Sequence, residues 1–126
     1  MVGGIVLALL ALRAGVEVRR ARARGRGRIS ELRRRHLQLA KLAVPVLLLG
    51  FTGGPLSMWL LRDREPFGTL HSLLGGIVAT LFVLTAVWGR RVEQGRLDVA
   101  TLHGRLALAA VIGAGAAAIA GFVLLP

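Results

Sequence analysis

The sequence predicts an all-α integral membrane protein, a four-helix bundle with its N- and C-termini outside. Its 126 residues are 55% hydrophobic with a mean hydropathy of +0.68, which leaves less polar surface than a soluble domain of this size carries. The charges are also segregated, because long apolar runs alternate with short charged segments. This pattern is typical of a polytopic helical membrane protein.

The basic residues are concentrated near the N-terminus. The net charge is +11, and ten of the 17 basic residues lie between Arg13 and Arg35. Cytoplasmic loops of membrane proteins retain Lys and Arg, so this block predicts an inside segment that contacts anionic lipid headgroups and no nucleic acid. The chain has no cysteine, which excludes disulfides, thiolate metal sites and covalently attached c-type haem.

Three regions follow along the chain. Residues 1–18 form a predicted N-terminal transmembrane helix in which Arg13 and Glu17 can pair at i,i+4 spacing. A cleaved signal peptide is disfavoured because the positive charge follows the apolar run. Residues 19–35 form an Arg-rich cytoplasmic connector, and residues 36–126 form a three-helix membrane core.

The core contains three further predicted spans, numbered two to four after the N-terminal helix. The loop between spans two and three has charges that cancel, and the loop between spans three and four has a net charge of +1. The basic segments then lie inside and the neutral one outside, as the topology requires. The spans and loops are His36–Leu61, Arg62–Pro66, Phe67–Gly89, Arg90–Asp98 and Val99–Leu125.

The chain has three histidines, His36, His71 and His103, and each opens an apolar segment. Each is followed 18 residues later by a glycine, and 18 residues are five helical turns, so each pair shares a helix face about 27 Å apart. Chance is the alternative, since the chain has 17 glycines. The three glycines are Gly54, Gly89 and Gly121.

The predicted topology sorts these residues into two levels. Spans two and four enter from the inside, so His36 and His103 share the inner level with Gly89. His71 lies at the outer level with the other two glycines. Two neutral imidazoles on different helices can bind haem iron from both sides, which favours electron transfer, and a nearby glycine leaves room for the macrocycle. Structural histidines near the headgroups are the alternative.

Other side chains could complete such sites. Lys41 and Arg105, with Arg35, lie close in sequence to the inner histidines and could pair with haem propionates. At the outer level His71 stands alone, with Met58 as a candidate second ligand through its thioether. A pigment or a quinone is the other candidate ligand for that level.

Two segments resemble a known family. TLHSLLGGIVATLFVLTAVWG and TLHGRLALAAVIGAGAAAIAGFVLLP resemble core helices of the cytochrome b561 class of transmembrane di-haem electron carriers. RRRHLQLAKLAVPVLLLGFTGG is similar to an uncharacterised bacterial, mainly cyanobacterial, relative of that class. The resemblance covers about residues 33–126 and implies a multi-pass protein of the bacterial inner membrane, cytoplasmic or intracytoplasmic.

The resemblance also implies a ligand scheme. In that class four consecutive helices each supply a histidine, and the first pairs with the third and the second with the fourth. Carried over, His36 pairs with His103, while His71 would need a histidine on a further helix, which this chain does not contain. The chain then holds one haem b, borrows a ligand from a second subunit and so can hold two, or has lost haem and keeps the fold.

Two functions are therefore predicted. The first is a small b-type haem protein that relays electrons, alone or as a subunit of a larger complex. The alternative is a non-catalytic accessory subunit of a respiratory or photosynthetic membrane complex that binds lipid or pigment without haem. Under either function, the chain is expected to be an electron carrier or an accessory subunit rather than a stand-alone enzyme. Both functions also imply the lipid bilayer and other membrane subunits as partners.

Overall fold

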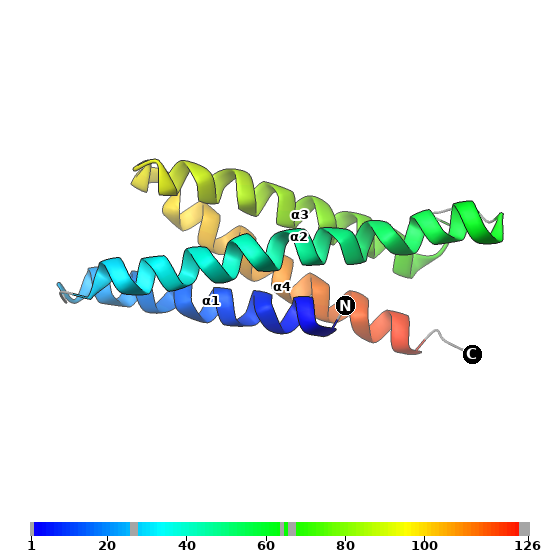
Figure 1. Cartoon of the computed structure of the whole chain (residues 1–126), viewed down its shortest axis with the longest axis horizontal. Coiled ribbons are helices and arrows are strands. Elements are labelled where there is room, and N and C mark those ends of the chain that lie inside the picture. Colours follow the sequence, from blue (N-terminus) through cyan, green and yellow to red (C-terminus); the bar gives the residue numbers. More distant parts are fainter. Residues whose placement is uncertain (1, 26–27, 64, 66–67, 124–126) are drawn as a thin grey trace.

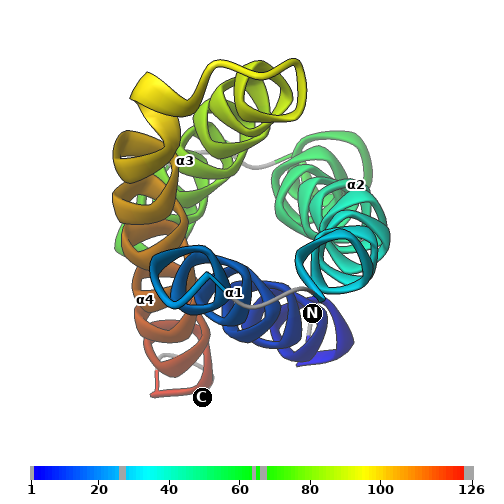
Figure 2. The same ribbon diagram turned by 90° about the vertical axis from the view of Figure 1, so that its left-hand side faces the viewer.

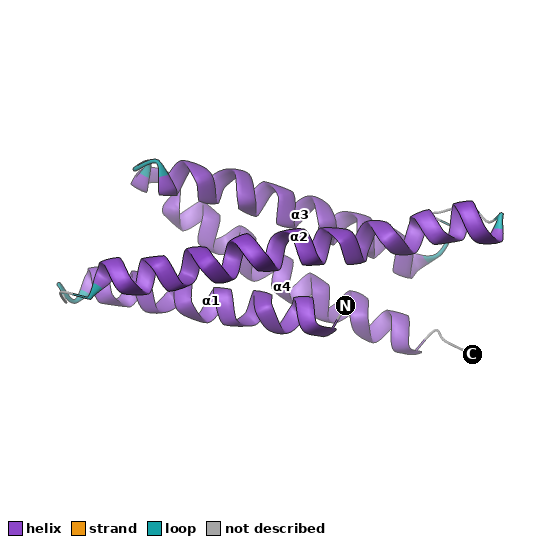
Figure 3. Ribbon diagram, in the orientation of Figure 1, coloured by secondary structure: helices purple, strands orange, loops and turns teal. Residues whose placement is uncertain are grey.

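The computed structural model describes residues 2–25, 28–63, 65 and 68–123, and among these residues every regular element is helical (Figures 1 and 3). This confirms the all-α prediction and the bundle of four helices. The helices are α1 (Val2–Ala23), α2 (Ile29–Arg62), α3 (Leu70–Glu93) and α4 (Ala100–Val123), with a short 3-10 turn, η1 (Leu97–Val99), before α4.

The four helices form a four-sided ring when viewed down the long axis (Figure 2). Each helix packs against the next one in the chain, and α1 closes the ring against α4. Packing is closest within the two hairpins α1–α2 and α3–α4 and sparser between α2 and α3. Helices α2 and α4 therefore face each other across a diagonal.

Both hairpin turns lie at the same end of the bundle, on the left in Figure 1. We call it the basic end, because arginines flank both turns, among them Arg22, Arg24, Arg90, Arg91 and Arg96. The connection from α2 to α3 lies at the opposite end. This arrangement brings the arginines beside the two hairpin turns together at one end of the bundle.

Three helical segments within the described residues are long and apolar enough to cross a membrane. They indicate a membrane protein. Helix α1 is not among them, because Arg13, Glu17 and Arg19 interrupt its apolar run. Its Arg13 Nε and Glu17 Oε1 lie 3.3 Å apart, which confirms the predicted pair. A fourth span through α1 and the outside location of both termini stay predictions. The three candidate spans are Ile29–Leu61, Leu70–Glu93 and Leu97–Val123.

The helices extend further into the basic segments than hydropathy predicted. Helix α1 continues to Ala23 and α2 begins at Ile29, so most of the predicted connector 19–35 is helical. Arginine is a good helix former, and Glu31 lies in the first turn of α2, where a negative charge is favourable. A hydropathy pattern shows where an apolar segment ends, but a helix can continue beyond that point.

Helix α3 is shifted by a few residues from its prediction. Thr69 caps its N-terminus, and the Thr69 and Ser72 side chains each bond to the other residue's backbone N–H in a capping box. The helix ends at Glu93, four residues beyond the predicted Gly89, and Gly95 then adopts a φ of +97° in the turn to α4. Parts of the predicted outer loop, Phe67 and the C-terminal residues 124–126 lie outside the described residues.

The core is built from all four helices near the middle of the bundle. Leu47 and Val78 are the largest fully buried side chains, and Phe51 stacks on Phe82 with ring centroids 6.3 Å apart. Helix α4 contributes small residues, which let the helices approach closely. A Cβ added at Gly113 would lie 2.9 Å from Val78 Cγ2. The buried alanines of α4 are Ala110, Ala114 and Ala117, each 0% exposed.

This close approach gives a stability prediction. Gly113→Ala should destabilise the bundle by about 1–3 kcal/mol, because the new methyl meets the stiff, buried Val78 side chain. Gly115→Ala is the matched control on the same helix, since nothing lies within 4 Å of its added Cβ. The midpoint of SDS-induced unfolding measures both changes. Equal midpoints for the two variants would contradict the close α3–α4 packing.

Candidate functional site

All three histidines make the same contact with a neighbouring helix. In each, Nδ1 lies within hydrogen-bond distance of a backbone carbonyl oxygen. A carbonyl only accepts, so each bond requires a protonated Nδ1, and a neutral imidazole of that tautomer has its free lone pair on Nε2. The bonds run from His36 to Ala11 O (2.9 Å), from His71 to Ala117 O (2.9 Å) and from His103 to Thr85 O (3.0 Å).

A glycine lies under each imidazole ring, four residues after the accepting carbonyl. A helical carbonyl points along the axis toward residue i+4, so a side chain there would occupy the space that the ring needs. A Cβ added at these glycines would lie 3.1 Å (Gly15), 3.0 Å (Gly89) and 2.6 Å (Gly121) from the histidine Cε1. We call this unit, an Nδ1–H···O=C bond with the ring over the glycine, a histidine clasp.

The clasps between α3 and α4 are reciprocal. His71 of α3 lies on Gly121 of α4, and His103 of α4 lies on Gly89 of α3. Because each histidine precedes its own helix's glycine by 18 residues, an antiparallel pair brings both contacts into register at once. The topology predicted these two neighbours. The space beside each glycine holds an imidazole ring, however, and this is a different role from the predicted one of leaving room for a macrocycle.

The clasp between α1 and α2 is one-sided. His36 lies on Gly15, which the sequence reasoning missed, while nothing lies within 4 Å of a Cβ added at Gly54. Gly54, which was predicted to share the outer level with His71, therefore forms no clasp. The signal that could have found Gly15 is a small residue four positions before a glycine, as in Ala11-x-x-x-Gly15.

At the basic end, the edge-on rings of His36 of α2 and His103 of α4 lie opposite each other across the diagonal, and we call them the facing histidine pair. Their ring centroids are 6.2 Å apart and their planes make an angle of 74°. Two imidazoles that bind one metal from opposite sides through bonds of about 2 Å have ring centres roughly 6 Å apart. The described residues contain no cluster of three or more His, Asp or Glu that could hold a metal ion. The histidine pair is therefore the best candidate site.

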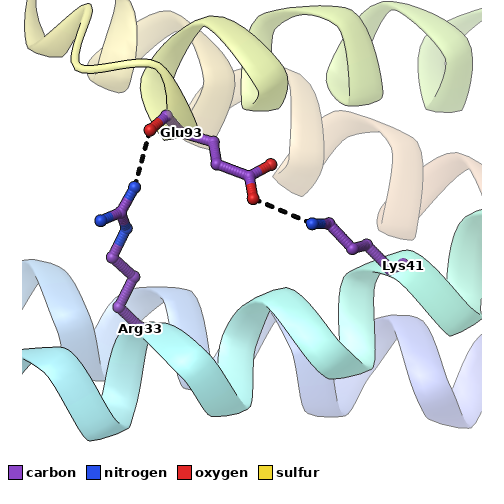
Figure 4. Close-up of polar contacts among 3 residues, drawn as sticks. All are labelled: Arg33, Lys41 and Glu93. Carbon is purple, nitrogen blue, oxygen red and sulfur yellow. Dashed lines mark hydrogen bonds and ion pairs between the residues drawn. The ribbon is translucent and has the colours of Figure 1, made fainter.

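A polar cluster lies beside this level, between α2 and α3 (Figure 4). Lys41 Nζ donates to Glu93 Oε1 at 2.9 Å, and Arg33 Nη2 donates to the Glu93 backbone oxygen at 2.7 Å. Lys41 was predicted as a candidate partner of a haem propionate, and in the structure its partner is the Glu93 carboxylate. The sequence reasoning missed Glu93 because it assigned this residue to a loop.

The remaining predicted residues lie apart from one another. Arg105 is exposed on α4, two residues after His103, and Met58 is half-buried in α2. His71 lies toward the opposite end of the bundle, in its clasp with Ala117 and Gly121. The propionate role of Arg105 and the ligand role of Met58 stay predictions.

The clasp gives a prediction that a double-mutant cycle can test. Gly121→Ala should destabilise the bundle by about 1–3 kcal/mol, because its methyl would displace the His71 ring. In a His71→Ala background the same change should cost little, since the ring is gone. Gly54→Ala, which is also 18 residues after a histidine, is the control and should not lower the SDS midpoint. If the effects of Gly121→Ala and His71→Ala on stability are additive, contact with the His71 ring is not the cause of the destabilisation.

Comparison with known proteins identifies no family. No protein-family model matches the chain, and no curated protein and no solved structure is significantly similar to it. The resemblance to the cytochrome b561 class thus stays a prediction from the quoted segments.

Proposed function

We propose that this chain is an integral membrane protein that binds one b-type haem between His36 and His103 and relays electrons, alone or within a larger complex. The observation that carries the proposal is the facing histidine pair, with ring centroids 6.2 Å apart on two diagonal helices. This separation suits two axial ligands of a single iron.

The chemistry of the two histidines also fits a haem. A metal-binding histidine typically donates its other ring N–H to a carbonyl or carboxylate, which fixes the tautomer and the ring orientation. The carbonyls of Ala11 and Thr85 accept such bonds from His36 and His103. Each Nε2 then keeps the lone pair that iron requires. When bound, a haem with two histidine ligands supplies one-electron chemistry.

The proposed location is the bacterial inner membrane, with several spans and both termini outside. The charge distribution supports this orientation, because cytoplasmic loops retain Lys and Arg and the basic end carries both hairpin turns. Arg35 and Arg105 are exposed close to the two ligands in sequence and are the candidate partners of the propionates.

An accessory subunit without haem is the second candidate. The observation that favours it is His71, which makes the same clasp as the other two histidines. The clasp therefore has a structural role that needs no cofactor. In this case the apolar helix surfaces would contact neighbouring subunits, and large exposed side chains such as Leu61 (82% exposed) and Phe122 (81%) are available for this.

The visible spectrum distinguishes the two candidates. Protein expressed with ample haem and purified in mild detergent should show a Soret band and, after dithionite reduction, the sharp α-band of a low-spin b-type haem, because both axial positions are histidine. Absence of Soret absorbance from such material would sink the haem proposal and favour the accessory subunit.

Three matched substitutions separate ligation from the structural role of the clasp. Each of His36→Ala, His103→Ala and His71→Ala removes one clasp and should cost a similar 0.6–1.7 kcal/mol or so in stability. Only the first two should abolish the low-spin spectrum or convert it to high spin, since His71 lies away from the facing pair. Spectra and SDS midpoints of all three check this. Loss of haem in His71→Ala as well, at a midpoint no lower than those of the other two variants, would contradict the assignment of ligands.

A further inference from the structure

Two grooves lie along the seam between α2 and α3, which is packed less closely than the hairpins. The groove at the basic end has a volume of about 450 Å³ and is lined by Leu37 and six polar residues. We call it the cationic groove; its polar lining comprises Ser30, Arg33, Arg34, Gln38, Lys41 and Glu93. The apolar groove, of about 320 Å³, is lined chiefly by Phe51, Pro55, Leu56, Trp59 and Ala79.

The two grooves lie on the same face of α2. Arg33, Arg34 and Lys41 precede Phe51, Thr52 and Trp59 by 18 residues each, which is five complete turns. A helix presents the same face after five turns, so both grooves face the same neighbour, α3. The seam therefore has a charged end and an apolar end along one line.

The charged end favours an anionic ligand. Three cations line the cationic groove, and Glu93 is its one carboxylate. Lys41 and Arg33 already bond to Glu93, and the sum of the charges remains positive. Ser30 and Gln38 add neutral hydrogen-bond donors. A phosphate group suits this lining, because arginine and lysine are the main phosphate ligands in proteins.

The length of the seam suits a phospholipid. Phe51, at the near end of the apolar groove, is ten residues beyond Lys41, or about 15 Å along the axis. One leaflet of a bilayer is about 20–22 Å thick with its headgroups. A lipid with its phosphate in the cationic groove would therefore reach the apolar groove with an acyl chain. We propose that the α2–α3 seam is a specific binding site for one anionic phospholipid. This site does not depend on the proposed haem.

Native mass spectrometry of the full chain, released from detergent after titration with phosphatidylglycerol, tests the proposal. One tightly bound lipid per chain is expected. Arg34→Gln combined with Lys41→Gln should weaken binding about 30-fold, since each cation near a membrane surface contributes roughly fivefold. Arg22→Gln combined with Arg24→Gln is the matched control, because it removes two exposed charges at the basic end that lie outside the groove. An equal loss in both double variants would overturn the proposal.

Two further variants test the site without removing a cation. Glu93→Gln should tighten binding about fivefold, because it removes the one carboxylate from the groove. Ala79→Leu should weaken binding of the long-chain lipid by partly filling the apolar groove. Unchanged or weaker binding in Glu93→Gln, or unchanged binding in Ala79→Leu, would overturn the proposed site. SDS midpoints equal to that of the wild type verify folding.

Inorganic phosphate distinguishes a lipid from a free anion. It should bind far more weakly than phosphatidylglycerol, because it makes no contact with the apolar groove. If phosphate displaces the lipid at equal concentration, the apolar groove takes no part and the proposal fails. The lipid measurements and the haem spectra report on different residues, so either proposal can fail without the other.

Discussion

The interaction on which the bundle depends is the hydrogen bond from an imidazole Nδ1–H to a carbonyl that is already part of a helix. In a membrane little water competes for polar groups, so a histidine N–H needs an acceptor within the protein. A carbonyl oxygen has two lone pairs and can accept both from its own helix and from the histidine. The ring can approach only where the next turn has no side chain, and Gly15, Gly89 and Gly121 provide this space. Between α3 and α4 the reciprocal clasps of His71 and His103 fix the register at both ends.

The facing histidine pair follows from this packing. One clasp orients His36 within the α1–α2 hairpin, and another orients His103 within the α3–α4 hairpin. Docking of the two hairpins then brings the rings to a centroid separation of 6.2 Å. The two imidazoles thus need no metal to hold their positions. A ligand pair that is ordered in advance reduces the free-energy cost of binding a cofactor, because fewer side chains must be immobilised.

Hydropathy and charge were enough to predict four helices, their order and the shared level of His36 and His103. The 18-residue spacing also carried real information, since it holds in the reciprocal α3–α4 clasps. Gly54, 18 residues after His36, forms no clasp. The clasp partner of His36 is Gly15 on α1, and the length of the α1–α2 turn sets which residue of α1 lies beside His36. Glu93 could not be predicted as a partner of Lys41. The apolar run stops at Gly89, but Arg and Glu are good helix formers, and α3 continues for another turn.

The contacts within the two hairpins differ from the contacts at the seam between α2 and α3. Each hairpin is held by at least one clasp, whereas α2 and α3 are joined by the bonds of Glu93 at one end and by the stacking of Phe51 on Phe82 further along. Of these, the Lys41–Glu93 ion pair is exposed, and exposed ion pairs contribute little stability. The separation of His36 and His103 depends on how the hairpins dock, so it depends on this seam together with the contact of α1 with α4 that closes the ring. A change in the seam can therefore alter the spacing of the two imidazoles while every clasp stays intact.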